Sequence, residues 1–290
     1  MLVQLLLNAI RGFLIGVAEV IPGVSGGTVA LVVGIYEKVL AQAAHVSRAI
    51  ATLFSKPSEA IRHLGRLDFR FLIPIGIGMV LAIMMAAAVL EPLFVTSPEI
   101  LFALFAGLIA ASIVVPFKMV TRWQVQHFTA AALAAIAAFM LTSLPQGNAA
   151  NPAAWVVFVS ATVAICALVL PGVSGSFFLL AIGMYQPTIA AVNDRDLAYL
   201  GVFALGALVG LLSFAVFMQF LLDRFRAMTL AVMTGLMLGS LRALWPWQTE
   251  SRQLLPPSDP LAPLLAFCAG ALIVSGLIVW QRRHNRASAQ

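Results

Sequence analysis

The segment Pro-Gly-Val-Ser-Gly occurs twice in this chain, at residues 22–26 and 171–175, and both copies lie within long apolar stretches. The copies are 149 residues apart (171 − 22), and beyond Lys38 the offset between matching residues becomes 128, as for Asp68 and Asp196 (196 − 68). A single gap of 21 residues (149 − 128) reconciles the two offsets. Self-similarity of this kind predicts a duplicated chain with two homologous halves.

Composition then indicates where these halves, 1–145 and 146–290, reside. Hydrophobic residues make up 62% of the chain and charged residues 10%, which is far from the range of soluble domains. Lipid cannot satisfy backbone polar groups, so we expect an all-α polytopic membrane protein. Apolar runs long enough to cross a hydrocarbon core of roughly 30 Å lie at 71–90, 99–117, 128–144, 199–221, 228–244 and 262–280.

The distribution of basic residues predicts the orientation. Lys and Arg gather in 38–70, 118–122, 224–226 and 282–286, whereas 91–98 and 142–154 contain none. The positive-inside rule then places the basic segments and both termini in the cytoplasm, which also accounts for the net charge of +6 without nucleic acid. Three spans in each half would give the halves opposite orientations, as in transporters built from inverted repeats.

The stretches around the two Pro-Gly segments, 3–40 and 155–185, must each return to the side where they began. We therefore expect two helical hairpins that open to opposite sides of the membrane. The arms from Phe13 to Ile21 and from Thr28 to Tyr36 are nine residues long, or about 14 Å at helical rise. This length favours re-entrant hairpins over fully spanning ones, although charge alone leaves both open.

The hairpin tips combine residues that suit an anion. Proline ends one arm, glycine permits the turn, and Ser25 or Ser174 is a favoured N-cap for the next helix. The first amides of that helix lack helical acceptors and would face a phosphate near the bilayer centre. Close helix packing through Gly and Ser is the alternative. The phosphate-binding candidates are Pro22, Gly23, Val24, Ser25, Gly26, Gly27, Thr28, Pro171, Gly172, Val173, Ser174, Gly175 and Ser176.

Three charged residues complete the candidate site. Glu19 is a carboxylate inside an apolar arm, and we expect either a proton-coupling role or a structural hydrogen bond to the amides of its own hairpin. Arg11 and Arg242 are placed to neutralise a phosphate, or else to extend toward the nearer membrane surface. Cys166 and Cys268 lack ligand spacing, so neither a metal site nor any other cofactor is predicted.

The motifs resemble those of the bacterial polyprenyl-phosphate translocases. The resemblance rests on residues 12–37, including Glu19 and the Pro22–Thr28 segment, and on 171–176 with 183–185. It implies an inner-membrane transporter, not an enzyme, whose partner is a polyprenyl phosphate lipid. Such a protein returns undecaprenyl phosphate from the outer to the cytoplasmic leaflet for carrier-lipid recycling in cell-wall biogenesis. Its oligomeric state, including a homo-oligomer, stays open.

Two other classes of protein compete with this interpretation. Undecaprenyl-pyrophosphate phosphatases share inverted repeats and a similar loop, but as a family they carry an arginine there, where this chain has Gly26 and Gly175. Ser25 also lacks a nearby His or Lys in the sequence that would activate it as a nucleophile. A small-anion channel or exchanger is the third class, since opposed helix ends suit chloride or inorganic phosphate equally well.

Overall fold

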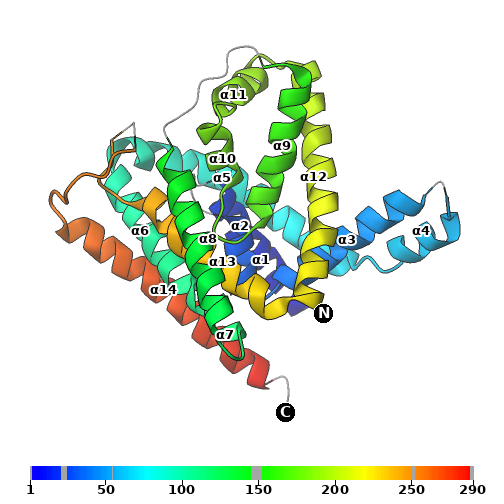
Figure 1. Ribbon diagram of the computed structural model, residues 1–290, viewed down its shortest axis with the longest axis horizontal. Helices are drawn as coiled ribbons and strands as arrows, with labels where there is room; N and C mark the ends of the chain where they lie inside the picture. Colours follow the sequence, from blue (N-terminus) through cyan, green and yellow to red (C-terminus); the bar gives the residue numbers. More distant parts are fainter. Residues whose placement is uncertain (1, 21–24, 54, 145–151, 250–251, 288–290) are drawn as a thin grey trace.

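A computed structural model of the chain describes residues 2–20, 25–53, 55–144, 152–249 and 252–287 (Figure 1). These ranges are helical apart from loops and one isolated bridge between Gln248 and Leu254. The helices of residues 1–145 are α1 (Leu2–Val20), α2 (Gly26–Val32), α3 (Tyr36–Thr52), α4 (Pro57–Leu64), α5 (Phe69–Thr96), α6 (Pro98–Ser112), α7 (Val114–Met119) and α8 (Val125–Ser143). Those of residues 146–290 are α9 (Ala154–Val169), α10 (Gly175–Ala181), α11 (Tyr185–Asn193), α12 (Leu197–Arg224), α13 (Arg226–Ser240), the 3-10 turn η1 (Leu241–Leu244) and α14 (Leu261–Ala287).

Helix lengths repeat at the offsets found in the sequence. Helices α2 and α10 have seven residues each and begin 149 residues apart (175 − 26). Helices α5 and α12 have 28 residues each, α6 and α13 have 15 each, and both pairs begin 128 residues apart (197 − 69 and 226 − 98). The extra residues of the first half form α4 and lengthen α3 relative to α11. The opposite orientation of the two halves stays a prediction.

The apolar helices agree with a multi-pass membrane protein. Among the described residues, six helices are long and apolar enough to cross a membrane, and up to eight if each bent pair counts as one span. Five of them coincide with predicted spans. The sixth predicted span, 71–90, lies within the 28-residue helix α5, whose residues 69–85 count as a candidate span together with α4, at a bend of 65°. The additional candidate is Leu2–Glu19 in α1.

The arms of the first hairpin are unequal, which corrects the expected nine-residue arms. Helix α1 runs for 19 residues, about 28 Å at helical rise, and continues through Arg11, whereas α2 has only seven residues. Asn8 helps to accommodate the arginine inside the helix, because its amide oxygen accepts a hydrogen bond from the Arg11 guanidinium at 3.2 Å. In the second half, α9 has 16 residues, and α10 and α11 meet at 108°.

The long helices pack in pairs around the short helices α2 and α10. Helix α1 lies along α5, α9 along α12, α6 along α14 and α8 along α13. Matching glycines allow two of these close approaches: a Cβ at Gly78 would collide with the Ala9 carbonyl oxygen of α1, and a Cβ at Gly206 with the Phe158 carbonyl oxygen of α9. Figure 1 shows α2 and α10 near the centre of the view, and both chain ends toward its lower edge.

Helices α3 and α4 extend to one side of the bundle in Figure 1, and the first turn of α3 contains two charged residues, Glu37 and Lys38. Lys38 pairs with Asp68 at 2.7 Å, and Glu37 pairs with Arg226 of the second half at 2.6 Å. All four side chains are about half exposed, so each pair contributes little to stability. The Glu37–Arg226 pair nevertheless shows that α3 meets the start of α13.

Candidate functional site

The start of α2, which follows the first Pro-Gly segment in the sequence, meets the second Pro-Gly segment inside the bundle, where α2 contacts α9. Pro22, Gly23 and Val24 lie outside the described residues, so the first tip is defined here by Ser25 and α2. Ser25, Thr28 and Pro171 are almost completely buried. The predicted proximity of the two tips is therefore present, although they are 145 residues apart in the chain.

Hydrogen bonds join the two tips directly. The Ser25 hydroxyl lies 3.0 Å from the Leu168 carbonyl oxygen and 3.1 Å from that of Leu170, so its single proton is shared between the last carbonyls of the α9 arm. In the other direction, the Gly172 amide donates to the Thr28 hydroxyl at 2.9 Å. These groups satisfy each other across the contact, where an unpaired donor would cost about 1–3 kcal/mol.

Two glycines permit this close approach. A Cβ at Gly27 would collide with the carbonyl oxygen of Val169 in the opposite arm. Gly172 has φ +88°, a conformation that L side chains rarely adopt, and a Cβ there would lie 2.5 Å from the Met237 backbone nitrogen. Close packing, the alternative interpretation of the glycines, is therefore part of what the tips do.

The two serines predicted as N-caps behave differently. Ser174 caps α10, because its hydroxyl accepts a hydrogen bond from the Phe177 amide at 3.4 Å and also lies 3.0 Å from the Ser176 hydroxyl. Ser25 occupies the N-cap position of α2 but makes no side-chain cap. The predicted N-cap position of Ser25 is therefore confirmed, but the side-chain bond to an amide of α2 is not made, and the hydroxyl is directed toward the carbonyls that end the opposite arm.

Glu19 lies against the start of α2 in its own hairpin. Its carboxylate is a hydrogen-bond acceptor for the Gly26 amide, and a Cβ at Gly26 would collide with its Oε1 atom. This is the structural contact considered beside the proton-coupling role. In the second half, Leu168 takes the equivalent place against Gly175, so only the first tip carries a carboxylate at this position.

Arg11 does not reach the contact between the tips. Its guanidinium lines a cavity of about 50 Å³ together with Leu14, Val32 and Leu277. Three of these residues, Leu14, Val32 and Leu277, also line a larger apolar groove of about 360 Å³ between α1, α2, α6 and α14. Thr28, whose hydroxyl takes part in the tip contact, is among the residues that line this groove. Arg11 and Thr28 thus line two neighbouring cavities that share apolar residues.

Arg242 lies in η1 on the other side of the tips. Its guanidinium donates to the Thr142 carbonyl oxygen at 2.6 Å and to the Arg252 carbonyl oxygen at 2.8 Å, and it faces the Phe139 ring at 5.3 Å. Its Nε atom is buried without a hydrogen-bond partner. The arginine therefore fastens residues 245–249 and 252–260, which we call the strap, to the end of α8.

Sequence reasoning missed Arg252, which extends from the strap onto α10. Its guanidinium lies 4.1 Å from the centre of the Phe177 ring, and no hydrogen bond or ion pair holds its side chain among the residues that the structure describes. Burial of the Arg252 side chain is the main cause that lowers its pKa, and the positive charge of Arg242 lowers the pKa further. The sequence could have pointed to Arg252, because it is the one basic residue in 243–281.

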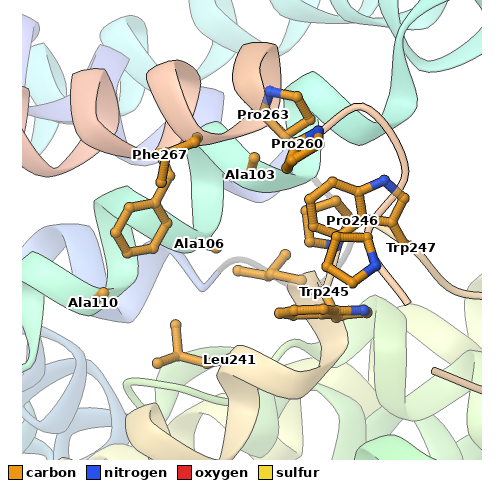
Figure 2. Close-up of a pocket in the computed structure, with 13 residues that line it drawn as sticks. Ala103, Ala106, Ala110, Leu241, Trp245, Pro246, Trp247, Pro260, Pro263 and Phe267 are labelled. Carbon is orange, nitrogen blue, oxygen red and sulfur yellow. The ribbon is translucent and has the colours of Figure 1, made fainter. Parts of the chain in front are cut away.

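Two further cavities flank the tips. The strap, η1, α6 and α14 enclose an apolar pocket of about 480 Å³, in which Figure 2 shows Trp245 and Trp247 near Pro260 and facing Phe267. A second cavity, of about 580 Å³, is lined by Lys38, Lys118 and Glu37 together with mainly apolar residues. No cluster of potential metal ligands occurs within the described ranges.

Comparison with known proteins agrees with this architecture. A model of the undecaprenyl phosphate translocase-like family matches residues 15–259. A Vibrio cholerae protein named polyprenyl-phosphate transporter is 36% identical over 88% of this chain and 82% of its own length. A Staphylococcus aureus protein of the same name is 29% identical over 83% of this chain and 86% of its own length. No solved structure matches. With nearly the whole chain matched, this helical, multi-pass membrane protein belongs to the undecaprenyl phosphate translocase-like family.

Proposed function

We propose that this protein transports a polyprenyl phosphate, and that it moves undecaprenyl phosphate from the outer to the cytoplasmic leaflet of the bacterial inner membrane. Family membership and the names of the two relatives support the substrate class. The partners in this proposal are the lipid and the membrane.

The observation that carries the proposal is the junction of the apolar groove with the tip contact at Thr28. A polyprenyl phosphate is a long hydrocarbon with one charged end, so its site needs an apolar channel beside polar groups. The groove is apolar along α1, α2, α6 and α14, and its lining includes Thr28, whose hydroxyl is already engaged in hydrogen bonding. A small anion would have no use for such a channel, which favours a lipid over chloride or inorganic phosphate.

Basic residues on both sides of the tips support alternating access. Arg242 and Arg252 lie on the side of η1 and the strap, and Lys38 and Lys118, together with Glu37, line the 580 Å³ cavity on the side of α3 and α7. We place the first side outside the cell and the second in the cytoplasm with both termini, as the basic loops predict. We propose that the two halves, 1–145 and 146–290, are inverted repeats, and that each has a re-entrant hairpin and three spans. Movement of one half against the other would open the site to one side of the membrane and then to the other.

The surroundings of Ser25 favour transport over phosphoryl transfer. Its hydroxyl faces the carbonyl oxygens of Leu168 and Leu170, which do not remove protons as a general base does. Breaking the tip contact and passing a phosphate through it needs no covalent step. We therefore propose a transporter without phosphatase activity.

The test uses the purified full-length protein in liposomes that contain a fluorescent polyprenyl phosphate. Quenching from one side measures how fast the lipid changes leaflets, with protein-free liposomes as the control. We expect faster exchange, no release of inorganic phosphate from polyprenyl pyrophosphate, and no decay of a chloride or phosphate gradient. Phosphate release that is lost in Ser25→Ala would establish the phosphatase, and a collapsed anion gradient without lipid exchange would establish the channel.

A further inference from the structure

We propose that Arg242 and Arg252 together form an anion-binding site, separate from the tip contact, that receives the phosphate group of a lipid before transport. The site lies where the strap crosses η1 and the first turns of α10. It rests on the proposed function for the identity of the lipid, but its ability to bind a phosphate group can be measured independently.

The side chain of Arg252 is held in place while its donors stay available. Its guanidinium lies over the Phe177 ring at 4.1 Å, which fixes the plane of the group through a cation–π contact. Arginine has five N–H donors in a rigid fork, and none of them has a partner in the described part of the chain. A half-buried arginine with unpaired donors suits an acceptor that arrives from outside.

The backbone around Arg252 is held in an unusual conformation. Arg252 has φ +64°, which is uncommon for a residue with a side chain. The Thr249 carbonyl oxygen accepts a hydrogen bond from its amide at 2.9 Å, and its own carbonyl oxygen accepts one from Arg242 at 2.8 Å. These bonds keep a second cation beside the first although the two charges repel each other. An anion between them offsets this repulsion, and two guanidinium groups match the several oxygens of a phosphate.

The neighbouring apolar pocket indicates that this phosphate belongs to a lipid. One turn, η1, contributes Arg242 to the cation pair and Leu241 and Leu244 to the 480 Å³ pocket. Figure 2 shows the pocket walls formed by the strap tryptophans, by alanines of α6 and by Phe267 of α14, without a charged side chain among the labelled residues. The charged end of a lipid phosphate would bind at the arginines while part of its hydrocarbon chain occupies the pocket.

Binding of farnesyl phosphate and of inorganic phosphate to the purified full-length protein tests the site. We expect Arg252→Gln to weaken binding of farnesyl phosphate roughly tenfold to a hundredfold, as for loss of charge-assisted hydrogen bonds. Arg252→Lys should retain part of the affinity, and Arg242→Ala should lose more than Arg242→Lys. Phe177→Leu should weaken binding less than Arg252→Gln, because it removes only the support beneath the guanidinium. Arg195→Gln, which removes an exposed positive charge between α11 and α12, is the matched control and should bind normally.

Two comparisons answer two separate questions: whether the phosphate belongs to a lipid, and whether the site exists. Tighter binding of farnesyl phosphate than of inorganic phosphate supports a lipid, and equal affinities with the same dependence on Arg252 identify a soluble phosphate instead. Wild-type affinity in a folded Arg252→Gln protein, with unchanged tryptophan fluorescence from the strap, overturns the site even if the wild type transports lipid. If the wild type binds through Arg252 yet moves no polyprenyl phosphate, the transport proposal fails and the site remains.

Discussion

The Thr28 hydroxyl accepts a hydrogen bond from the Gly172 amide at 2.9 Å, across 144 residues of chain. The bond joins the first turn of α2 to the turn before α10, and both groups are buried. The Ser25 hydroxyl also donates to carbonyl oxygens at the end of the α9 arm. The tips therefore meet through polar groups inside an apolar bundle. In the transport that we propose, a phosphate group that passes between the tips would have to replace these bonds.

Replacing Thr28 by valine should destabilise this contact. Valine preserves the shape of the side chain but leaves the Gly172 amide without an acceptor, which costs about 1–3 kcal/mol when the donor is buried. We expect a lower melting temperature in detergent and slower lipid exchange in liposomes. Thr28→Ser keeps the hydroxyl and serves as the control. A valine variant that melts with the wild type would show that the bond contributes nothing measurable.

Gly27→Ala should interfere with the approach of the two tips. The added methyl group would collide with the Val169 carbonyl oxygen, which belongs to backbone and cannot rotate away like a side chain. We expect a loss of about 1–3 kcal/mol of stability and at least a tenfold loss of transport. Gly76→Ala in α5 is the matched control, because nothing lies within 4 Å of its added Cβ. Equal transport by both alanine variants would contradict the close contact.

Glu19→Gln should separate the structural role of this residue from a proton-coupling role. Glutamine keeps an oxygen that can accept the Gly26 amide, so we expect normal yield. It cannot exchange a proton, so the pH dependence of lipid exchange should flatten. Glu19→Leu, which copies Leu168 of the second half, should lower the yield because the amide loses its acceptor. Unchanged pH dependence in a well-expressed glutamine variant would limit Glu19 to structure.

Single cysteines should report opposite sides of the membrane for α4 and α11. In a background without Cys166 and Cys268, we would introduce Ser58→Cys or Asn193→Cys, both at exposed positions. An impermeant thiol reagent applied to intact spheroplasts should label the second variant only, and permeabilised cells should label both. Labelling of the first variant in intact spheroplasts would reverse the proposed orientation.

The helical membrane architecture could be predicted from local properties of the sequence. A run of apolar residues in lipid must form a helix because its backbone groups have no other partners, and Pro and Gly mark where helices end. The repeated segment therefore predicted two matching helices 149 residues apart, which are α2 and α10, although each has seven residues where an arm of nine was expected. Five of the predicted spans are candidate spans of the structure. The length of α1 was missed, because Asn8 provides a partner for Arg11 within the helix.

The sequence by itself determined which residues are near each other along a helix and which segments can enter a membrane. Tertiary structure alone decided the partners across the bundle. Ser25 bonds to the end of α9 instead of capping α2, and Arg252 covers Phe177 from a loop 75 residues later (252 − 177). The physical reason is that such contacts depend on the rotation and depth at which packed helices meet. Those quantities are set by the fit of all the side chains between the helices, not by the pattern of any one segment.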